Sequence, residues 1–306
     1  MGAPVLAVVG PTASGKTALA AGLAARLGSE VISADCMLVY RGADIGTAKP
    51  TAAERRGVVH HLIDVVSPSG SFSVADYEHA ALPVVRRLLD EGKVPVLCGG
   101  TGFYVQSVLF SRGQGGAAGD PALRAELEGI AAREGNSALH AMLRAVDPES
   151  ADKLHPNDVR RVVRALEIFH LTGRKKSAQG DGFVPRFPYL CVAPAYPRDR
   201  LYARIDRRVD AMLEAGLVEE VRALLESGVP ADAQCMQGIG YKEVVQYLKN
   251  EISHCTMRDI IQKNTRNYAK RQITFFKKIP NIVWLDARGQ DLEGQVMELL
   301  WKMQEN

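Results

Sequence analysis

Short runs of apolar residues alternate with helical patterns along the first third of the chain. Continuous apolar segments predict buried strands at residues 5–9, 31–33, 62–66 and 94–98. Apolar positions three and four residues apart predict helices over 16–27 and 74–89 and a helix that begins at Gly102. Because strands and helices alternate, we expect an α/β fold, a mostly parallel sheet flanked by helices on both faces.

The pattern changes after residue 112. Residues 111–120 are rich in glycine, and the apolar period from Pro121 to about Phe169 is helical throughout. An apolar run at 189–192 then predicts a strand that rejoins the sheet. We therefore expect a core domain of residues 1–112 and 189–306, and a helical insertion domain of residues 113–188.

The last third of the chain is mostly helical in pattern. Helices are predicted over 200–215, 218–225, 241–248 and 258–276, followed by a strand over 282–285. The sequence contains no internal repeat. It also contains no apolar run long enough to span a bilayer, so no membrane partner is expected.

Composition narrows the class of protein. With 306 residues, of which 46% are hydrophobic and 24% charged, the chain can bury a core without disulfides or a structural metal. The five cysteines are scattered, with no spacing typical of a metal or redox motif. Since the N-terminus has no signal-like segment, we expect a cytoplasmic protein. The net charge of +3 is too small to indicate a polyanionic partner unless basic residues cluster.

A complete phosphate-binding loop, G-x-x-x-x-G-K-[ST], joins the first predicted strand to the first predicted helix. Its residues are Gly10, Pro11, Thr12, Ala13, Ser14, Gly15, Lys16 and Thr17. Backbone amides of such a loop converge on phosphate oxygens, the lysine neutralises charge, and the threonine hydroxyl can ligate Mg²⁺. The core therefore has the pattern of P-loop NTPases. The loop does not identify its ligand; nucleotides are the default, and any diphosphate fits.

Asp35 and Thr101 each follow a predicted strand, at the edge of the sheet where ligands bind. The Asp35 carboxylate suits a general base, a ligand for Mg²⁺ or a helix cap. Thr101 either faces the ligand or caps the helix that begins at Gly102. Neither residue alone identifies the reaction.

Basic residues gather at two places. One predicted helix carries Arg160, Arg161 and Arg164, and a second cluster runs over 263–278 with Tyr268, Phe275 and Phe276 interleaved. Each cluster is either a solvated helix face or a surface that binds RNA phosphates and stacks on unpaired bases. Arg207 and Arg208 also allow two interpretations: they lie on a solvent-exposed helix face, or one of them binds a diphosphate through two hydrogen bonds.

Several strings together resemble the tRNA dimethylallyltransferase family, also called tRNA isopentenyltransferases. Besides the phosphate loop they are Ser-Ala-Asp-Cys-Met-Leu-Val-Tyr-Arg-Gly-Ala-Asp-Ile-Gly-Thr-Ala-Lys-Pro at 33–50, His-His-Leu-Ile-Asp at 60–64, Gly-Gly-Thr-Gly-Phe-Tyr at 99–104, His-Pro-Asn-Asp at 155–158, Gly-Ile-Gly-Tyr-Lys at 238–242 and Ala-Lys-Arg-Gln-Ile-Thr at 269–274. They span nearly the whole chain in the family's order, and the Asp-Ile-Gly-Thr-Ala-Lys-Pro string is highly specific.

The resemblance implies transfer of a dimethylallyl group from dimethylallyl diphosphate to N6 of adenosine 37 of tRNA. It implies that Asp35 binds and deprotonates the adenine amine, and that Thr101 hydrogen-bonds near the bridging oxygen of the departing diphosphate. The phosphate loop and Arg208 would hold the diphosphate, with Mg²⁺ as cofactor at Thr17.

The resemblance also implies how the tRNA anticodon stem-loop binds. The target base must leave its stack to reach the pocket, and the insertion domain would clamp the stem-loop. The implied tRNA contacts are Cys36, Met37, Leu38, Arg124, Arg160, Arg161, Val162, Val163, Arg164, Gln237, Gly238, Ile239, Gly240, Tyr241, Lys242, Lys270, Arg271, Gln272, Thr274 and Lys277. We expect a monomer.

The sequence departs from the family at two of these positions. Many members have Ser at the position of Cys36 and Gln at that of Leu38, so polar contacts to the anticodon bases are altered here. Two other functions share the phosphate loop: a nucleotide or small-molecule kinase, which would consume ATP, and an RNA-binding NTPase or regulator, which would not need Asp35 and Thr101.

Overall fold

The computed structural model describes residues 3–111, 119–178, 183–288 and 291–305. Contacts divide the chain into two compact units: Met1–Leu109 with Pro185–Asn306, and Phe110–Val184. We call them the core unit and the helical unit. The sequence suggested boundaries a few residues later, at 112 and 188. None of the helices in the described part of the chain has both the length and the apolar character needed to cross a membrane.

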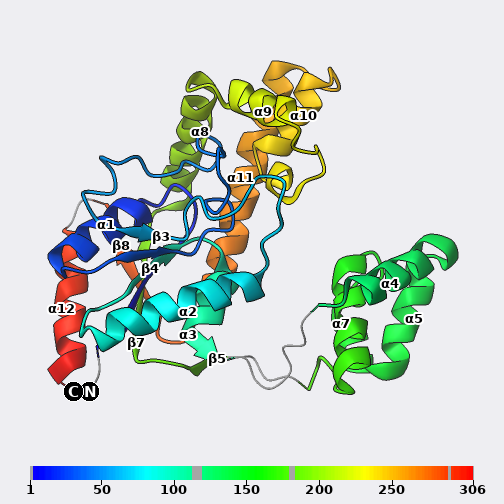
Figure 1. The fold of residues 1–306 in the computed structure, drawn as a ribbon, viewed down its shortest axis with the longest axis horizontal. Coiled ribbons are helices and arrows are strands. Elements are labelled where there is room, and N and C mark those ends of the chain that lie inside the picture. The colour runs from blue at the N-terminus through cyan, green and yellow to red at the C-terminus, as the bar shows by residue number, and fades with distance from the viewer. Residues whose placement is uncertain (1–2, 112–118, 179–182, 289–290, 306) are drawn as a thin grey trace. The chain divides into compact units, whose positions relative to one another are not determined.

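A parallel sheet of six strands forms the centre of the core unit (Figure 1). In spatial order the strands are β3 (His60–His61), β2 (Val31–Ser33), β4 (Val96–Gly99), β1 (Val5–Val9), β7 (Tyr189–Ala195) and β8 (Val283–Asp286). Every residue of the central strand β1 is buried, as its unbroken apolar run predicts. The predicted α/β class and parallel sheet are confirmed.

Helices cover both faces of this sheet (Figure 1). On one face, α1 (Lys16–Arg26) and α12 (Leu292–Glu305) pack on alternate strand residues such as Leu6 and Val8. On the other face lie α2 (Val74–Asp90) and α3 (Gly102–Leu109), which contact β1, β2 and β4. The capping box of Ser73 and Asp76 begins α2.

A second hydrophobic cluster in the core unit holds a layer of helices together. These are α8 (Arg198–Glu214), α9 (Leu217–Glu226), the 3₁₀ turn η1 (Gln234–Gln237), α10 (Tyr241–Leu248) and the long helix α11 (His254–Phe276). Val39 and Tyr40, from the loop after β2, are buried in the same cluster. That loop is therefore fixed by the helices.

The helical unit has a core of its own. It contains α4 (Pro121–Glu134), α5 (Asn136–Val146), α6 (Pro148–Lys153) and α7 (Val159–Thr172), packed around residues that include Leu139, Leu143 and Leu166. Two short strands, β5 (Phe110–Ser111) and β6 (Val184–Pro185), pair where the chain enters and leaves the unit. Residues 112–118, most of the predicted glycine-rich neck, lie outside the described residues.

One strand prediction is wrong. The apolar run at 62–66 is not a strand; β3 ends at His61, and Val66 forms only an isolated bridge with Tyr40. The reason is local, because Leu62 and Asp64 have φ angles of 62° and 59°, which a strand does not allow. Helix α12 was not predicted, although Leu292, Val296 and Leu300 repeat at helical spacing.

Gly99 is required by a close approach between strand ends. A Cβ at Gly99 would lie 2.0 Å from the carbonyl oxygen of Ala34, a distance that no real contact permits. Two backbone hydrogen bonds, from the Ala34 amide to Cys98 at 2.7 Å and from the Thr101 amide to Ala34 at 3.0 Å, hold these strand ends together. The Gly-Gly-Thr string thus brings Thr101 beside the residues that follow β2.

We expect Gly99→Ala to lower the free energy of unfolding by roughly 3 kcal/mol or more, because backbone must move to admit the new methyl group. Urea denaturation measures this loss. Gly28→Ala is the matched control: its φ is +57° with nothing within 4 Å, so only backbone strain of about 1 kcal/mol should appear. Equal costs for the two variants would contradict the steric argument.

Candidate functional site

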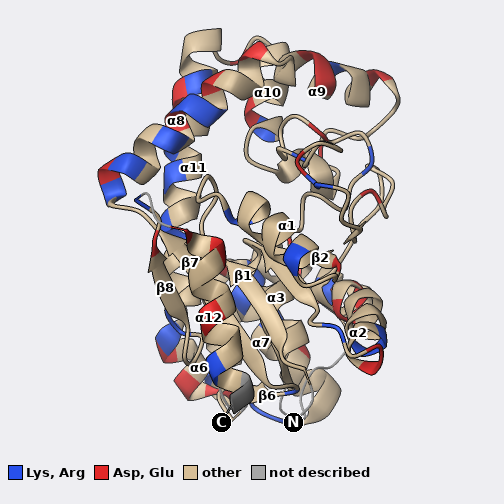
Figure 2. Ribbon diagram, turned by 90° about the vertical axis from the view of Figure 1, so that its left-hand side faces the viewer, with Lys and Arg blue, Asp and Glu red and all other residues tan. Residues whose placement is uncertain are grey.

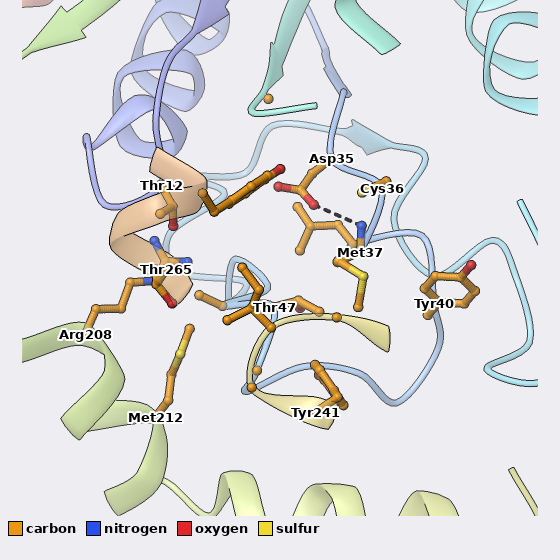
Figure 3. A pocket seen from close by; sticks show the side chains of 18 of the residues that line it. Thr12, Asp35, Cys36, Met37, Tyr40, Thr47, Arg208, Met212, Tyr241 and Thr265 are labelled. Atoms are coloured by element: carbon orange, nitrogen blue, oxygen red, sulfur yellow. Dashed lines mark hydrogen bonds between the residues drawn. The ribbon is translucent and has the colours of Figure 1, made fainter. Parts of the chain in front are cut away.

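A cavity of about 430 Å³ opens at the carboxyl ends of the strands, where ligands of parallel sheets bind. Its wall comes from the phosphate loop, the segment after β2 and the helices of the second layer (Figure 3). The predicted site residues that line it are Thr12, Lys16, Thr17, Asp35, Cys36, Met37, Leu38, Arg208, Gln237, Gly238, Ile239, Gly240, Tyr241, Lys242, Arg271 and Gln272. Residues from five separate parts of the sequence thus share one pocket.

The phosphate loop has the backbone shape of an anion cradle. Gly10, Ala13 and Gly15 have positive φ angles of 140°, 62° and 84°, and α1 begins directly afterwards at Lys16. The first amides of α1 therefore have no partner within the helix and face the concave side of the loop. The hydroxyl of Ser14 is buried without a hydrogen-bond partner among the described residues. These are unused donors suited to phosphate oxygens.

Gln272 of α11 joins the phosphate loop to the end of β4. Its Oε1 accepts a hydrogen bond from the Thr12 amide at 2.9 Å, and its Nε2 donates to the Gly100 carbonyl at 2.9 Å. The side chain is buried and both ends of its amide are used. Its side chain therefore holds the phosphate loop to the end of β4, and the implied tRNA contact at Gln272 stays a prediction.

The Asp35 side chain lines the pocket (Figure 3). One carboxylate oxygen accepts a hydrogen bond from the Met37 amide at 3.0 Å. The Thr101 hydroxyl oxygen accepts the Cys36 amide at 2.9 Å, so it fixes the residue beside Asp35. Burial raises the pKa of Cys36 to about 11, with Asp35 as a further cause. This thiol is therefore neutral at physiological pH.

Lys16 and Arg208 are cations that the protein leaves without a full countercharge. Burial lowers the pKa of each, and the negative charge of Asp35 acts in the opposite direction on both. Among the described residues, Arg208 has no hydrogen bond or ion pair, and Lys16 reaches only the Pro11 carbonyl at 3.4 Å. Since a half-buried cation without a partner is costly, the site favours an anionic ligand.

The structure distinguishes Arg208 from its neighbour. Arg208 lines the main cavity, whereas Arg207 is exposed and its Nε donates to the Ala203 carbonyl at 3.3 Å. Arg204 is held by its own contacts, a 2.8 Å hydrogen bond to the Ala13 carbonyl and a position over the Tyr196 ring. A second cavity of about 480 Å³ beside the phosphate loop is lined by all three arginines, which gives α8 a basic side (Figure 2).

A clamp that the sequence did not reveal fixes the Asp-Ile-Gly segment. The Glu220 carboxylate of α9 accepts hydrogen bonds from the amides of Asp44, Ile45 and Gly46 at 2.8, 2.7 and 3.1 Å. It also accepts the Tyr241 hydroxyl at 2.7 Å. The Tyr241 ring lies so close to Gly46 that a Cβ there would meet it at 2.5 Å. Residues 46–48 thereby become a wall of the cavity.

The remaining predicted tRNA contacts of the core unit differ in exposure. Gln237, Lys242, Lys270, Arg271, Thr274 and Lys277 are exposed. Tyr241 is fully buried with its hydroxyl engaged by Glu220, so its side chain forms part of the wall. Lys270, Thr274 and Lys277 do not line the cavity; they continue along α11 and just beyond its end, where basic residues follow one another (Figure 2).

In the helical unit, the predicted contacts separate into surface and interior. Val162 and Val163 are buried, so their side chains belong to the hydrophobic core. Arg124 and Arg164 both pair with the buried Glu167 carboxylate. Burial would raise the pKa of Glu167, but hydrogen bonds from these arginines outweigh it and lower the pKa. Arg160 and Arg161 are exposed on α7.

The side chains near the phosphate loop could bind a metal ion only together with oxygen atoms of a bound ligand. No group of three or more His, Cys, Asp or Glu side chains within the described residues could hold a metal ion. The Thr17 hydroxyl lines the cavity next to Lys16. A Mg²⁺ ion typically binds through one or two protein ligands together with phosphate oxygens and water, and Thr17 with a diphosphate meets that description.

Comparisons with known proteins cover almost the whole chain. A family model described as IPP transferase matches residues 38–279. A tRNA dimethylallyltransferase from Shouchella clausii is 44% identical over 296 residues, 96% of this chain and 95% of that protein. One from Bacillus velezensis is 46% identical over 299 residues, 97% and 95% of the two chains.

Two solved structures are similar as well. The tRNA isopentenylpyrophosphate transferase from Bacillus halodurans has a TM-score of 0.73 at 43% identity, covering 99% of this chain and 96% of that one. A eukaryotic dimethylallyltransferase acting on tRNA has a TM-score of 0.80 at 28% identity, covering 97% and 78%. The fold seen here is therefore shared along its full length.

We expect Glu220→Gln to loosen the Asp-Ile-Gly segment at 44–46. The glutamine amide has one acceptor oxygen where the carboxylate has two, and it carries no negative charge. Hydrogen exchange at the amides of residues 44–46 should accelerate by roughly tenfold or more, because a hydrogen bond to a charged group contributes about 1.5–3 kcal/mol. Glu219→Gln is the matched control, an exposed neighbour with no hydrogen bond among the described residues. Unchanged exchange in the Glu220 variant would argue against the clamp.

Proposed function

The chain belongs to the IPP transferase family, and from that membership we propose that it transfers the dimethylallyl group of dimethylallyl diphosphate to N6 of adenosine 37, beside the anticodon of tRNA. Diphosphate is the second product. Relatives named tRNA dimethylallyltransferase and a structural neighbour described as acting on tRNA support this acceptor.

One observation carries the proposal. Two half-buried cations that form no ion pair within the described residues, Lys16 and Arg208, share a cavity with the carboxylate of Asp35. The cations suit the anionic leaving group, and the carboxylate suits the proton of the attacking amine. Apolar side chains on the same wall, among them Ile205, Val209 and Met212, suit a short isoprenoid chain.

Asp35 acts on the nucleophile. The exocyclic amine of adenine is weakly nucleophilic because its lone pair is delocalised into the ring. As the bond between N6 and C1 of the dimethylallyl group forms, Asp35 accepts a proton from N6. The hydrogen bond from the Met37 amide orients the Asp35 carboxylate without neutralising its charge.

The phosphate loop acts on the leaving group. When the bond between C1 and the bridging oxygen breaks, its electron pair goes to the diphosphate, whose charge Lys16, Arg208 and the loop amides stabilise. Thr101 lies beside Asp35 and is proposed to donate its hydroxyl proton near the bridging oxygen. A Mg²⁺ ion held by Thr17 and the diphosphate would supply further positive charge.

The kinase alternative shares the loop and the sheet, but the family membership does not favour it. For the tRNA anticodon stem-loop, we propose that the exposed cations of α11 and α7 bind phosphates, with the helical unit acting as a clamp. Lys16, Thr17, Asp35 and Arg208 line one cavity of a single chain, so we propose a monomer. We also propose that the reaction takes place in the cytoplasm.

We expect Asp35→Ala to lower the rate of five-carbon addition about 10²- to 10⁴-fold, the range typical of a lost general base. The assay incubates the enzyme with dimethylallyl diphosphate, Mg²⁺ and an anticodon stem-loop RNA, and weighs the RNA by mass spectrometry. Stem-loop binding should survive, which separates catalysis from recognition. A normal rate in this variant would sink the role of Asp35, and ATP consumption by the wild type would favour a kinase.

We expect Arg208→Ala to raise the KM for dimethylallyl diphosphate and to lower kcat, because the guanidinium contacts the diphosphate before and during bond cleavage. The loss of one such donor typically costs about 2–4 kcal/mol in the transition state. Steady-state kinetics measure both constants. Arg200→Ala, an exposed arginine on the same helix, is the control and should match the wild type; equal behaviour of the two variants would refute the assignment.

A further inference from the structure

Phe103 is an aromatic side chain left largely in solvent beside the proposed active site. It is 62% exposed, and among the large exposed hydrophobic residues in the described ranges only Trp301 is also aromatic. Phe103 is the second residue of α3 and follows Thr101 by two positions. Two residues span at most about 7 Å between Cα atoms, so the backbone of Phe103 lies close to that of Thr101.

The Phe103 ring is held by α11. It meets the Phe275 ring edge to face, with 5.1 Å between centroids. Phe275 itself lies on Gly102, where a Cβ would come within 2.2 Å of its ring. The glycine therefore permits the contact that fixes Phe103, and the outer side of the Phe103 ring stays exposed.

A line of aromatic and cationic side chains connects Phe103 with the cavity. Tyr268 and Arg271 line the cavity, and the Arg271 guanidinium lies 5.7 Å from the centre of the Tyr268 ring. Arg271 and Phe275 are four residues apart on α11 and are therefore neighbours on its surface. Lys277 and Lys278 follow directly after the helix and are exposed.

We propose that Phe103 stacks on an unpaired base of the tRNA loop next to the target adenosine. This inference rests on the proposed function, because it assumes that the adenosine enters the cavity from this side. Alternating rings and cations fit a single-stranded nucleic acid, whose bases stack on aromatic faces while its phosphates meet positive charge. A protein partner would need a broader apolar surface than one ring.

The test compares side chains that keep the bulk of Phe103 with side chains that keep its π face. Phe103→Leu retains apolar volume without an aromatic ring, and Phe103→Trp retains the ring. We expect the leucine variant to bind an anticodon stem-loop roughly tenfold more weakly, the effect typical of one lost base stack, and the tryptophan variant to bind like the wild type. The KM for dimethylallyl diphosphate should not change. Trp301→Leu controls for the loss of an exposed aromatic residue elsewhere.

A cross-linking experiment locates the base directly. 5-Iodouridine is placed at each unpaired loop position in turn, the full-length enzyme is irradiated with the RNA, and the linked peptide is sequenced by mass spectrometry. Cross-links to Phe103 from a position adjacent to the target, absent in Phe103→Leu, support the proposal.

Other outcomes overturn it in distinguishable ways. If the wild type adds the five-carbon group while Phe103→Leu binds the stem-loop normally, the proposed function stands and the stacking contact does not. If the leucine and tryptophan variants both bind the stem-loop equally weakly, the packing of Phe103 matters at this position and its aromatic face does not. If the wild type adds no group to the RNA, both proposals fail together.

Discussion

The site depends on two cations that the fold holds beside one carboxylate without pairing them fully. Burial lowers the pKa of Lys16 and that of Arg208, and the negative charge of Asp35 acts against this effect on both. An anionic ligand therefore completes the electrostatics of the cavity.

The cavity wall consists largely of irregular backbone whose amides need partners. In each segment one side chain accepts hydrogen bonds from these amides. Gln272 accepts the amide of Thr12, Thr101 accepts that of Cys36, and Glu220 accepts those of residues 44–46. These acceptors come from helices or strand ends that are fixed by hydrophobic packing. The rigid parts of the fold thus determine the shape of its loops, which is how a precise pocket arises from segments without regular structure.

The sequence predicted the parts of this arrangement that are local. Apolar runs located five of the six sheet strands, and the phosphate loop with its flanking strand and helix was readable from spacing alone. The third strand failed because the backbone turns left-handed at Leu62 and Asp64, which no apolar pattern reveals. Glu220, Gln272 and the choice between Arg207 and Arg208 depend on which helix faces the loop. The periodicity of apolar residues does not predict such tertiary contacts. Only the family resemblance identified Arg208 as the residue that binds the diphosphate.

Basic residues counted along a sequence overstate the charge available to an RNA. In the helical unit, Arg124 and Arg164 form ion pairs with the buried Glu167. Arg160 and Arg161 are exposed, and Arg161 pairs with Asp158 at 3.0 Å. The positive charge of this cluster also affects Lys176. Burial lowers the pKa of Lys176, and the charges of Arg161 and Arg164 lower it further. A phosphate that lies between such cations reduces their mutual repulsion, so the cluster favours a polyanionic ligand.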